Sequence, residues 1–431
     1  MAPLLLAFYI MTIMVRPQDW WEPVRNWQLV TLGAILATIF SFPTLLGRFP
    51  IVFKRIPQLK AAMAFFMGLL LSILSMGWLT GVWLVFQEFG RVLFFFLLVL
   101  TLIQSVSDFK ILLWAVLFCI GWLAIHAILQ HNIGYGFGHQ EPLSRLHKDM
   151  GETRVWVQQA VAFGTFNDPN DLCTALVFAI PLFYVLFKTS NNPIQQMFAL
   201  VGVGVTAYGA YCTNSRGGVI AAFGMVVSYV LTRVKGFRRY LSAAFAVTLV
   251  TVLAPSRFSG HLIGHDRAVL WGDGVAMFKD NPVFGVGYKA FGDLSSEHLQ
   301  AHNTYIHTLA ELGLVGYLPL FLIIYLTAIH LRRAIVAIKP ISSQDALLLA
   351  GVYSSTIGYM TSLYFVSREY EHFFYLVMAL AITAVIVYCD RYGLTNKVFG
   401  NIKKDVRNGL FWGLGSVVIF YFTVRIANLL G

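Results

Sequence analysis

The stretch AHNTY, residues 301–305, lies at the centre of residues 255–316, the longest polar interruption in a mostly apolar chain. This interruption holds an arginine, several histidines and a run of glycine turns, and it leads back into an apolar segment at residues 313–330. Polar groups are costly inside a bilayer, so a membrane protein concentrates its chemistry where the chain leaves the lipid. We therefore expect the functional site to lie at this interruption.

The composition predicts an all-α, polytopic membrane protein. Of the 431 residues, 58% are hydrophobic and only 12% are charged, whereas soluble domains are about 25% charged. Many apolar runs approach the roughly 20 residues that a spanning helix needs, and such helices satisfy their own backbone hydrogen bonds. The net charge of +11 fits basic loops beside a membrane better than nucleic acid binding. We therefore expect membrane lipids, and no nucleic acid, as partners.

The apolar runs predict about 12–13 transmembrane helices. Gln87 and Glu88 are expected in the gap between the third and fourth spans. The predicted spans are at about 3–15, 28–46, 61–79, 91–106, 111–130, 171–188, 195–212, 218–233, 240–254, 313–331, 346–366, 373–389 and 410–429.

The polar segments between these spans divide the chain into five parts. The expected parts are N-terminal helices (1–130), a polar segment (131–170), core helices (171–254), a large loop (255–312) and C-terminal helices (313–431). If the N-terminus is cytoplasmic and the spans alternate, the basic loops at 47–60, 233–239, 332–340 and 390–409 all fall inside, as the positive-inside rule requires. Both long polar segments and the turns at Arg216 and Arg368 then fall outside.

The turn Ser215-Arg216-Gly217-Gly218 opens one of the core helices. A serine or the preceding asparagine can cap the helix, and the positive end of the helix dipole favours anions. Gly217 and Gly218 would let a ligand approach the backbone, and the planar guanidinium of Arg216 suits phosphate oxygens. These features predict a phosphate-binding turn. The alternative is an arginine that reaches lipid headgroups beside a glycine face used for packing.

A second arginine, Arg267, opens an amphipathic helical pattern that ends at residues 280–282. On this pattern alone the segment can be a helix on the membrane surface whose arginine pairs with Asp266 or Asp273.

His302 begins the helical pattern that leads into the span at 313–331. A neutral histidine can accept a proton from a hydroxyl group, as a general base must, and Tyr305 would share one side of the first helical turn with it. The alternative is a capping or packing histidine. A zinc site is not expected, because the zinc-protease pattern needs glutamate directly after the first histidine, and Leu299 follows His298.

Together these motifs resemble the O-antigen ligase and polymerase superfamily over residues 150–380. The resemblance is carried by the Ser-Arg-Gly-Gly turn, by the arginine helix followed by NPVFGVGY (281–288), and by AHNTY running into ELGLVG (311–316). The run NDPNDL (167–172) is similar to the branch that contains O-antigen ligases.

The resemblance implies a C-type glycosyltransferase fold with a helical periplasmic loop domain in the bacterial inner membrane. It implies an enzyme whose active site faces the periplasm. The enzyme would transfer a glycan en bloc, with inversion, from undecaprenyl diphosphate to lipid A–core, and would need neither a metal nor another cofactor.

The resemblance also implies roles for single residues. Arg216 and Arg267 match pyrophosphate-binding arginines, and His302 matches the essential histidine. Arg154 is a further match, while Arg145 and Arg368 are predicted from position alone.

Other functions remain open at this stage. A polymerase, or a ligase that glycosylates protein, would carry the same motifs on the same scaffold. A transporter is the alternative from a different class, although its charged residues would be expected at mid-membrane depth rather than at the ends of spans.

Overall fold

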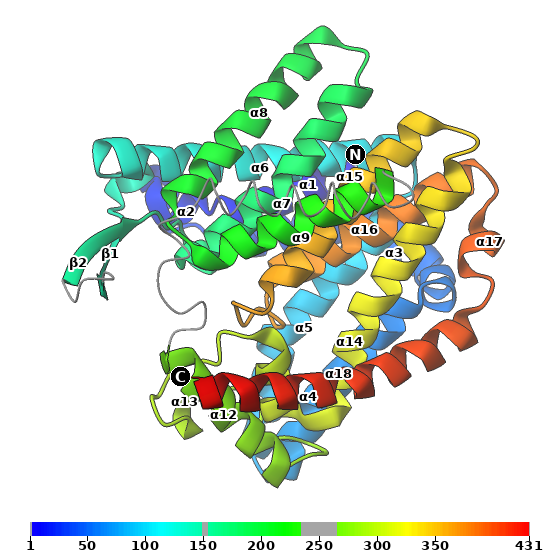
Figure 1. Ribbon diagram of the computed structural model, residues 1–431. Coiled ribbons are helices and arrows are strands. Elements are labelled where there is room, and N and C mark those ends of the chain that lie inside the picture. Colours follow the sequence, from blue (N-terminus) through cyan, green and yellow to red (C-terminus); the bar gives the residue numbers. More distant parts are fainter. Residues whose placement is uncertain (1, 149–153, 234–264, 431) are drawn as a thin grey trace.

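The computed structural model describes residues 2–148, 154–233 and 265–430, which are almost entirely helical (Figure 1). The longer helices are α1 (Ala2–Met14), α3 (Leu29–Arg55), α4 (Pro57–Ser75), α5 (Leu79–Leu102), α6 (Val106–Ile133), α7 (Pro169–Thr189), α8 (Pro193–Cys212), α9 (Arg216–Arg233), α12 (His265–Asp280), α14 (Thr304–Ile338), α15 (Ser343–Ser362), α16 (His372–Arg391) and α18 (Ile402–Leu430).

Short elements connect these helices. They are α2 (Pro17–Trp20), α13 (Phe291–Leu294), α17 (Thr395–Phe399) and three 3-10 turns, η1 (Glu22–Val24), η2 (Phe137–His139) and η3 (Gly164–Phe166). Strands β1 (Leu143–Lys148) and β2 (Arg154–Gln159) form an antiparallel hairpin in which Leu143 pairs with Gln159 and Lys148 with Arg154. The hairpin projects from the side of the helical body (Figure 1).

The structure confirms the predicted all-α membrane class. Within the described residues, seven helices are long and apolar enough to cross a bilayer: α3 to α7, α14 and α16. The predicted span at 240–254 lies outside the described residues, and each other predicted span coincides with a helix.

Some helix ends differ from the prediction. Helix α3 continues through most of the predicted loop at 47–60 although it contains Pro43 and Pro50. Helix α5 contains Gln87 and Glu88, which were predicted to lie between spans. Glu88 is tolerated there because its carboxylate accepts a hydrogen bond of 2.8 Å from the Tyr288 hydroxyl and pairs with Lys289 at 2.6 Å.

Ion pairs join three of the four predicted basic segments, those at 47–60, 332–340 and 390–409; the fourth, at 233–239, lies almost wholly outside the described residues. The Arg55 guanidinium donates to the Asp390 carboxylate at 2.8 Å, which joins the ends of α3 and α16. The Arg333 guanidinium donates to both oxygens of Asp405 at 2.6 and 2.7 Å.

Helix α14 is broken near its beginning. Gly313 has φ +58° and ψ −157°, and residues 282–287 bind the exposed backbone of the break. The Leu314 N–H donates to the Pro282 carbonyl at 2.9 Å, and the Gly287 N–H donates to the Glu311 carbonyl at 3.0 Å. An added Cβ at Gly313 would lie 2.4 Å from the Val283 carbonyl oxygen, so the glycine of ELGLVG is required there. The nine residues of α14 before the break thereby form a short segment that residues 282–287 hold in place.

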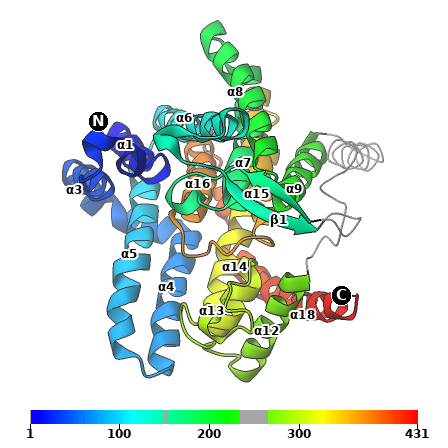
Figure 2. The same ribbon diagram turned by 90° about the vertical axis from the view of Figure 1, so that its left-hand side faces the viewer.

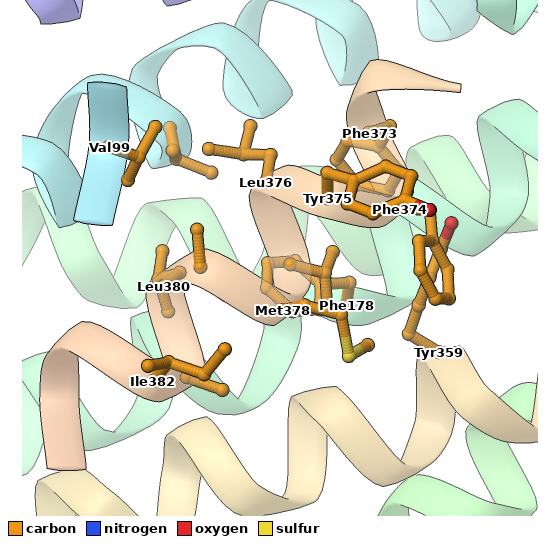
Figure 3. Packing of buried hydrophobic residues seen from close by; sticks show 14 of the residues in the cluster. Val99, Phe178, Tyr359, Phe373, Phe374, Tyr375, Leu376, Met378, Leu380 and Ile382 are labelled. Carbon is orange, nitrogen blue, oxygen red and sulfur yellow. The ribbon is translucent and has the colours of Figure 1, made fainter. Parts of the chain in front are cut away.

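Helix α16 lies at the centre of the core, and most of its residues are buried. Figure 3 shows Phe373, Tyr375 and Leu380 of this helix packed among side chains of its neighbours. Helices α4 and α5 lie side by side, and the end of α18 lies next to α12 (Figure 2). The loop at 363–371 lies close to the first residues of four helices: α7, α9, α14 and α16.

Candidate functional site

The AHNTY segment folds so that each neighbour of His302 is held. The Ala301 carbonyl accepts a hydrogen bond of 2.9 Å from the Trp271 indole. Asn303 caps α14, and its side-chain oxygen accepts from the N–H groups of Tyr305 and Ile306 at 3.0 and 3.2 Å. His302 lies between these anchors with φ +47°, in the left-handed region. His302 therefore lies outside the helix, and its side chain projects from the turn that precedes α14.

Tyr305 was predicted to share a face with His302, and the structure corrects this. Its ring is 7% exposed and stacks on Phe420, and its hydroxyl donates to the Met360 carbonyl at 3.0 Å. Because His302 is outside the helix in a left-handed turn, helical spacing does not relate the two residues. Tyr305 belongs to the helix core rather than to a substrate site.

The loop at 363–371 is fixed against the start of α14. The Thr304 hydroxyl donates to the Val366 carbonyl at 2.8 Å and accepts from the Arg368 N–H at 3.1 Å. The Arg368 guanidinium donates from Nε to one oxygen of Asp171 at 2.7 Å and from Nη2 to the other. Arg368 thus lies beside His302, where it is held in a bidentate pair with the first turn of α7.

A chain of capping side chains joins the starts of α7 and α9. The Asp168 carboxylate caps α7 and accepts from the Asn170 amide at 2.9 Å. The Ser215 hydroxyl donates to Asn170 at 2.7 Å and accepts from the Gly218 N–H at 3.0 Å, so it caps α9. Arg145 of the hairpin donates to Asp168 at 3.2 Å. Arg216, the first residue of α9, is placed directly beside this chain.

Several helix N-termini therefore meet at one place. Helices α7, α9, α14 and α16 begin at the residues joined by these contacts, and Arg267 lies in the first turn of α12. Each N-terminus carries the positive end of a helix dipole, about half an elementary charge. With the arginines, this arrangement favours an anion with several phosphate oxygens.

Gly217 and Gly218 have a different role from the predicted ligand approach. A Cβ on Gly218 would lie 2.0 Å from the Cys173 sulfur, and one on Gly217 would lie 3.0 Å from the Phe365 Cβ. The space beside both glycines is therefore filled by protein. They allow α9 to pack closely on α7 and on the loop at 363–371, as the packing alternative expected.

Arg267 points toward the same place. Its guanidinium lies 5.8 Å from the centre of the Phe365 ring, and it is within electrostatic reach of Asp168, Arg145 and Arg216. Burial is the main cause that lowers the pKa of Arg267, although an arginine stays protonated near neutral pH. Among the described side chains no carboxylate forms an ion pair with it.

The alternative partner for Arg267, Asp273, is engaged elsewhere. Its carboxylate accepts from the backbone and hydroxyl of Ser296 at 2.9 and 2.7 Å. The side chain of the other alternative, Asp266, lies outside the described residues, as does that of Arg154 in β2.

His302 is partly buried among these charges. Burial, and next the positive charge of Arg267, lower the pKa of His302 to about 4, against the opposing charge of Asp168. The imidazole is therefore neutral at physiological pH and has a nitrogen free of a proton. Over the described part of the chain, no group of three or more His, Cys, Asp or Glu side chains has the geometry of a metal site.

Residues 198–321 match the model of the O-antigen ligase family. This segment of the chain is therefore similar to the O-antigen ligase family. The matched segment contains Arg216, Arg267 and His302, the three residues on which the candidate site depends. No curated protein sequence matches the chain.

Residues outside the matched segment complete the candidate site. Arg145, Asp168, Asp171 and Arg368 approach it from the hairpin, from α7 and from the loop at 363–371. The run NDPNDL was recognised in the sequence, but no role was predicted for its aspartates. The Asp-Pro pair is typical of a helix cap followed by proline at the first helical position, and that signal could have identified Asp168.

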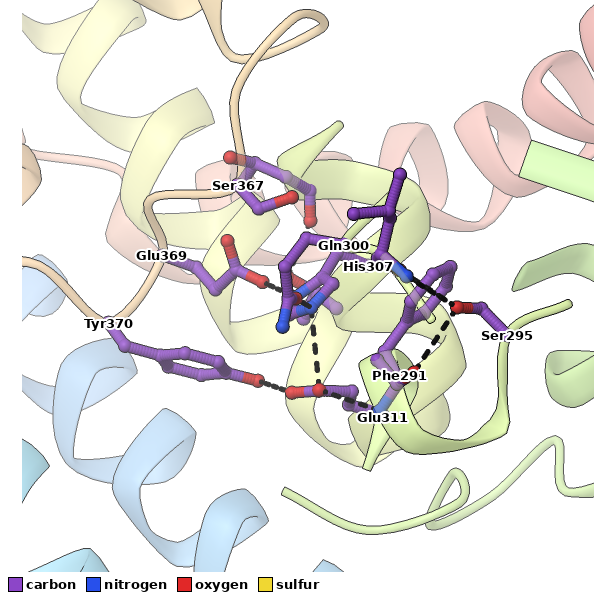
Figure 4. A network of polar contacts seen from close by, with 12 residues as sticks. Phe291, Ser295, Gln300, His307, Glu311, Ser367, Glu369 and Tyr370 are labelled. Carbon is purple, nitrogen blue, oxygen red and sulfur yellow. Dashed lines mark hydrogen bonds and ion pairs between the residues drawn. The ribbon is translucent and has the colours of Figure 1, made fainter. Parts of the chain in front are cut away.

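Sequence reasoning also missed a buried network around His307, shown in Figure 4. Glu311 and Glu369 are both fully buried. Buried acids in a membrane protein are rare enough to indicate function or tight pairing, which is the signal that could have found them.

Proposed function

We propose that this protein, which is similar to the O-antigen ligase family over residues 198–321, is an inverting glycosyltransferase of the bacterial inner membrane. It takes a glycan from undecaprenyl diphosphate at the periplasmic face and transfers it en bloc to a hydroxyl of lipid A–core. His302 is the general base, and Arg216 and Arg267 bind the pyrophosphate. Arg145 and Arg368 contribute positive charge from the rim of the site.

One observation carries the proposal. His302, Arg267 and Arg368 lie within electrostatic reach of one another and of Asp168 and Arg145, although they come from distant parts of the chain. The helix N-termini that meet there add to the same positive field. A diphosphate donor and a hydroxyl acceptor are the substrates that such a field beside a neutral imidazole fits.

The reaction follows from these positions. The His302 imidazole takes the proton of the acceptor hydroxyl while that oxygen forms a bond to the anomeric carbon. The bond between the anomeric carbon and the phosphate oxygen breaks, and its electron pair leaves with undecaprenyl diphosphate. Charge grows on the departing oxygen, where Arg216, Arg267 and the start of α9 stabilise it. Attack from the opposite face inverts the anomeric centre.

Reconstitution with purified substrates tests the proposal directly. Protein in liposomes is mixed with undecaprenyl-diphosphate-linked glycan and lipid A–core, with and without a chelator, and the products are separated by gel and mass spectrometry. We expect capped lipid A–core at equal rates in both samples. Glycan that instead grows longer on its own carrier would assign the protein to the polymerases. Transfer to a protein Ser or Thr would assign it to the protein ligases.

The pH dependence should reveal an interaction between donor and base. In the free enzyme the pKa of His302 is about 4, so kcat/KM should rise with pH through about that value as the base loses its proton. Bound diphosphate offsets the positive charge of Arg267 and Arg368, which raises the pKa of His302 in the complex. The acid limb of kcat should therefore lie at higher pH than that of kcat/KM.

Both limbs are measured from initial rates between pH 3.5 and 8 in the same liposomes. A diphosphate diester has no proton that titrates near neutrality, so the donor does not obscure the result. Coincident limbs, or a kcat/KM limb near the ordinary histidine value of about 6.5, would contradict the assignment of His302.

A further inference from the structure

A second histidine lies five residues after His302 and is enclosed by acids. The His307 Nδ1 donates to the Glu369 carboxylate, and Nε2 donates to the Gln300 side-chain oxygen (Figure 4). Nε2 also lies 3.4 Å from an oxygen of Glu311. Only the doubly protonated imidazolium can donate from both nitrogens. His307 is thus a buried cation between two buried carboxylates.

The remaining contacts of the network connect separate segments. Glu311 accepts from the Tyr370 hydroxyl at 2.8 Å and from the Phe291 N–H at 3.1 Å. The second oxygen of Glu369 has no hydrogen-bond partner among the described residues. The bond to His307 is therefore the hydrogen bond that fixes the Glu369 carboxylate. Removing it would leave a buried charge without compensation, which is costly.

The two bonds of His307 reach the two segments that form the candidate active site. Gln300 comes two residues before His302, and Asn303, directly after it, is fixed to α14 by its cap. Glu369 follows Arg368 in the loop that Thr304 holds. His307 thus connects the left-handed turn that carries the base with the loop that carries the arginine.

We propose that His307, together with Glu369, is a positioning residue that sets His302 and Arg368 in their relative places. The inference rests on the proposed function of the site, because it assigns how that site is held. His307 is buried, so in this proposal it acts through these two groups and not on a substrate. A shift of about 1 Å at a reacting group can cost on the order of 10²-fold in rate, and His307 prevents such a shift at two groups at once.

The test uses His307→Gln, which can donate to one partner but not to both, and Glu369→Gln, which keeps shape and removes charge. The matched control is His330→Gln. His330 is a buried histidine at the far end of the same helix, 3.4 Å from Asp405 and bonded to Gln58 at 3.2 Å. Rates are normalised to folded protein, measured by thermal melting in detergent, so that loss of fold and loss of geometry are separated.

We expect kcat to fall on the order of 10²-fold in both site variants and to stay within about twofold in the control. The double variant should lose no more than the single ones, because the two residues act through one bond. The acid limb of kcat/KM should also move up from about 4 toward the ordinary histidine value of about 6.5, because a loosened turn exposes His302 to water. Simple destabilisation would not shift that limb.

A second readout does not depend on transferase activity. Reaction of His302 with diethyl pyrocarbonate, mapped by mass spectrometry across pH, should be faster in His307→Gln than in wild type or the control. If wild type transfers no glycan, the proposed function fails, and the labelling still decides the positioning role. Folded His307→Gln protein with wild-type kcat, pH limb and labelling would overturn the inference.

Discussion

Replacing His302 by alanine should reduce glycan transfer by 10²- to 10⁴-fold, the range that loss of a general base costs. The acceptor hydroxyl would then have no positioned base to take its proton. The measurement is the initial rate of capped lipid A–core formation in liposomes. In cells, lipid-linked donor should accumulate while lipopolysaccharide stays uncapped.

Two further variants make this result specific. His302 has φ +47°, and asparagine tolerates the left-handed region better than alanine does. His302→Asn therefore keeps the turn while removing the basic nitrogen, and should be as inactive as the alanine variant. His298→Ala is the matched control, because His298 is exposed, also has a positive φ and lies in the same loop. Equal rates for His302→Asn and wild type would remove His302 from the mechanism.

Replacing Arg267 by alanine should lower kcat/KM by 10²- to 10³-fold, the cost of losing one donor to a developing oxyanion. The effect should be large because this guanidinium has no ion pair with a described carboxylate and so keeps its charge for the ligand. Arg267→Lys keeps the charge but loses the planar fork that matches phosphate oxygens, so an intermediate rate is expected. Arg216→Ala should behave like Arg267→Ala.

Donor binding distinguishes this effect from a folding defect. Undecaprenyl diphosphate, which carries the charge but no glycan, should bind more weakly to Arg267→Ala than to wild type. Lys279→Ala is the control, since Lys279 lies at the other end of α12 and rests on the Tyr421 ring at 4.9 Å. Unchanged affinity and unchanged rate in Arg267→Ala would place the pyrophosphate elsewhere.

The spans could be predicted because hydropathy and helix length follow from the bilayer itself. Their ends could not, because they depend on distant partners. Glu88 stays in a helix since Tyr288, 200 residues later, binds it. Arg368 and Asp171 form an ion pair across 197 residues, and no local pattern contains that information.

The candidate site was predicted only in part, because some of its contacts also depend on distant partners. Arg216, Arg267 and His302 each stand in a local motif whose chemistry can be read, whereas Tyr305 was misplaced because helical spacing was extended past the cap at Asn303. The glycines had two possible roles, and only the positions of Cys173 and Phe365 decide between them.

The break at Gly313 has a mechanical consequence. The nine residues before it carry His307 and Glu311, and the backbone on both sides of it is hydrogen-bonded to residues 282–287. These bonds fix the angle between the two parts of the helix. A change in bilayer thickness that tilts the spanning part would therefore also move the segment that carries His307.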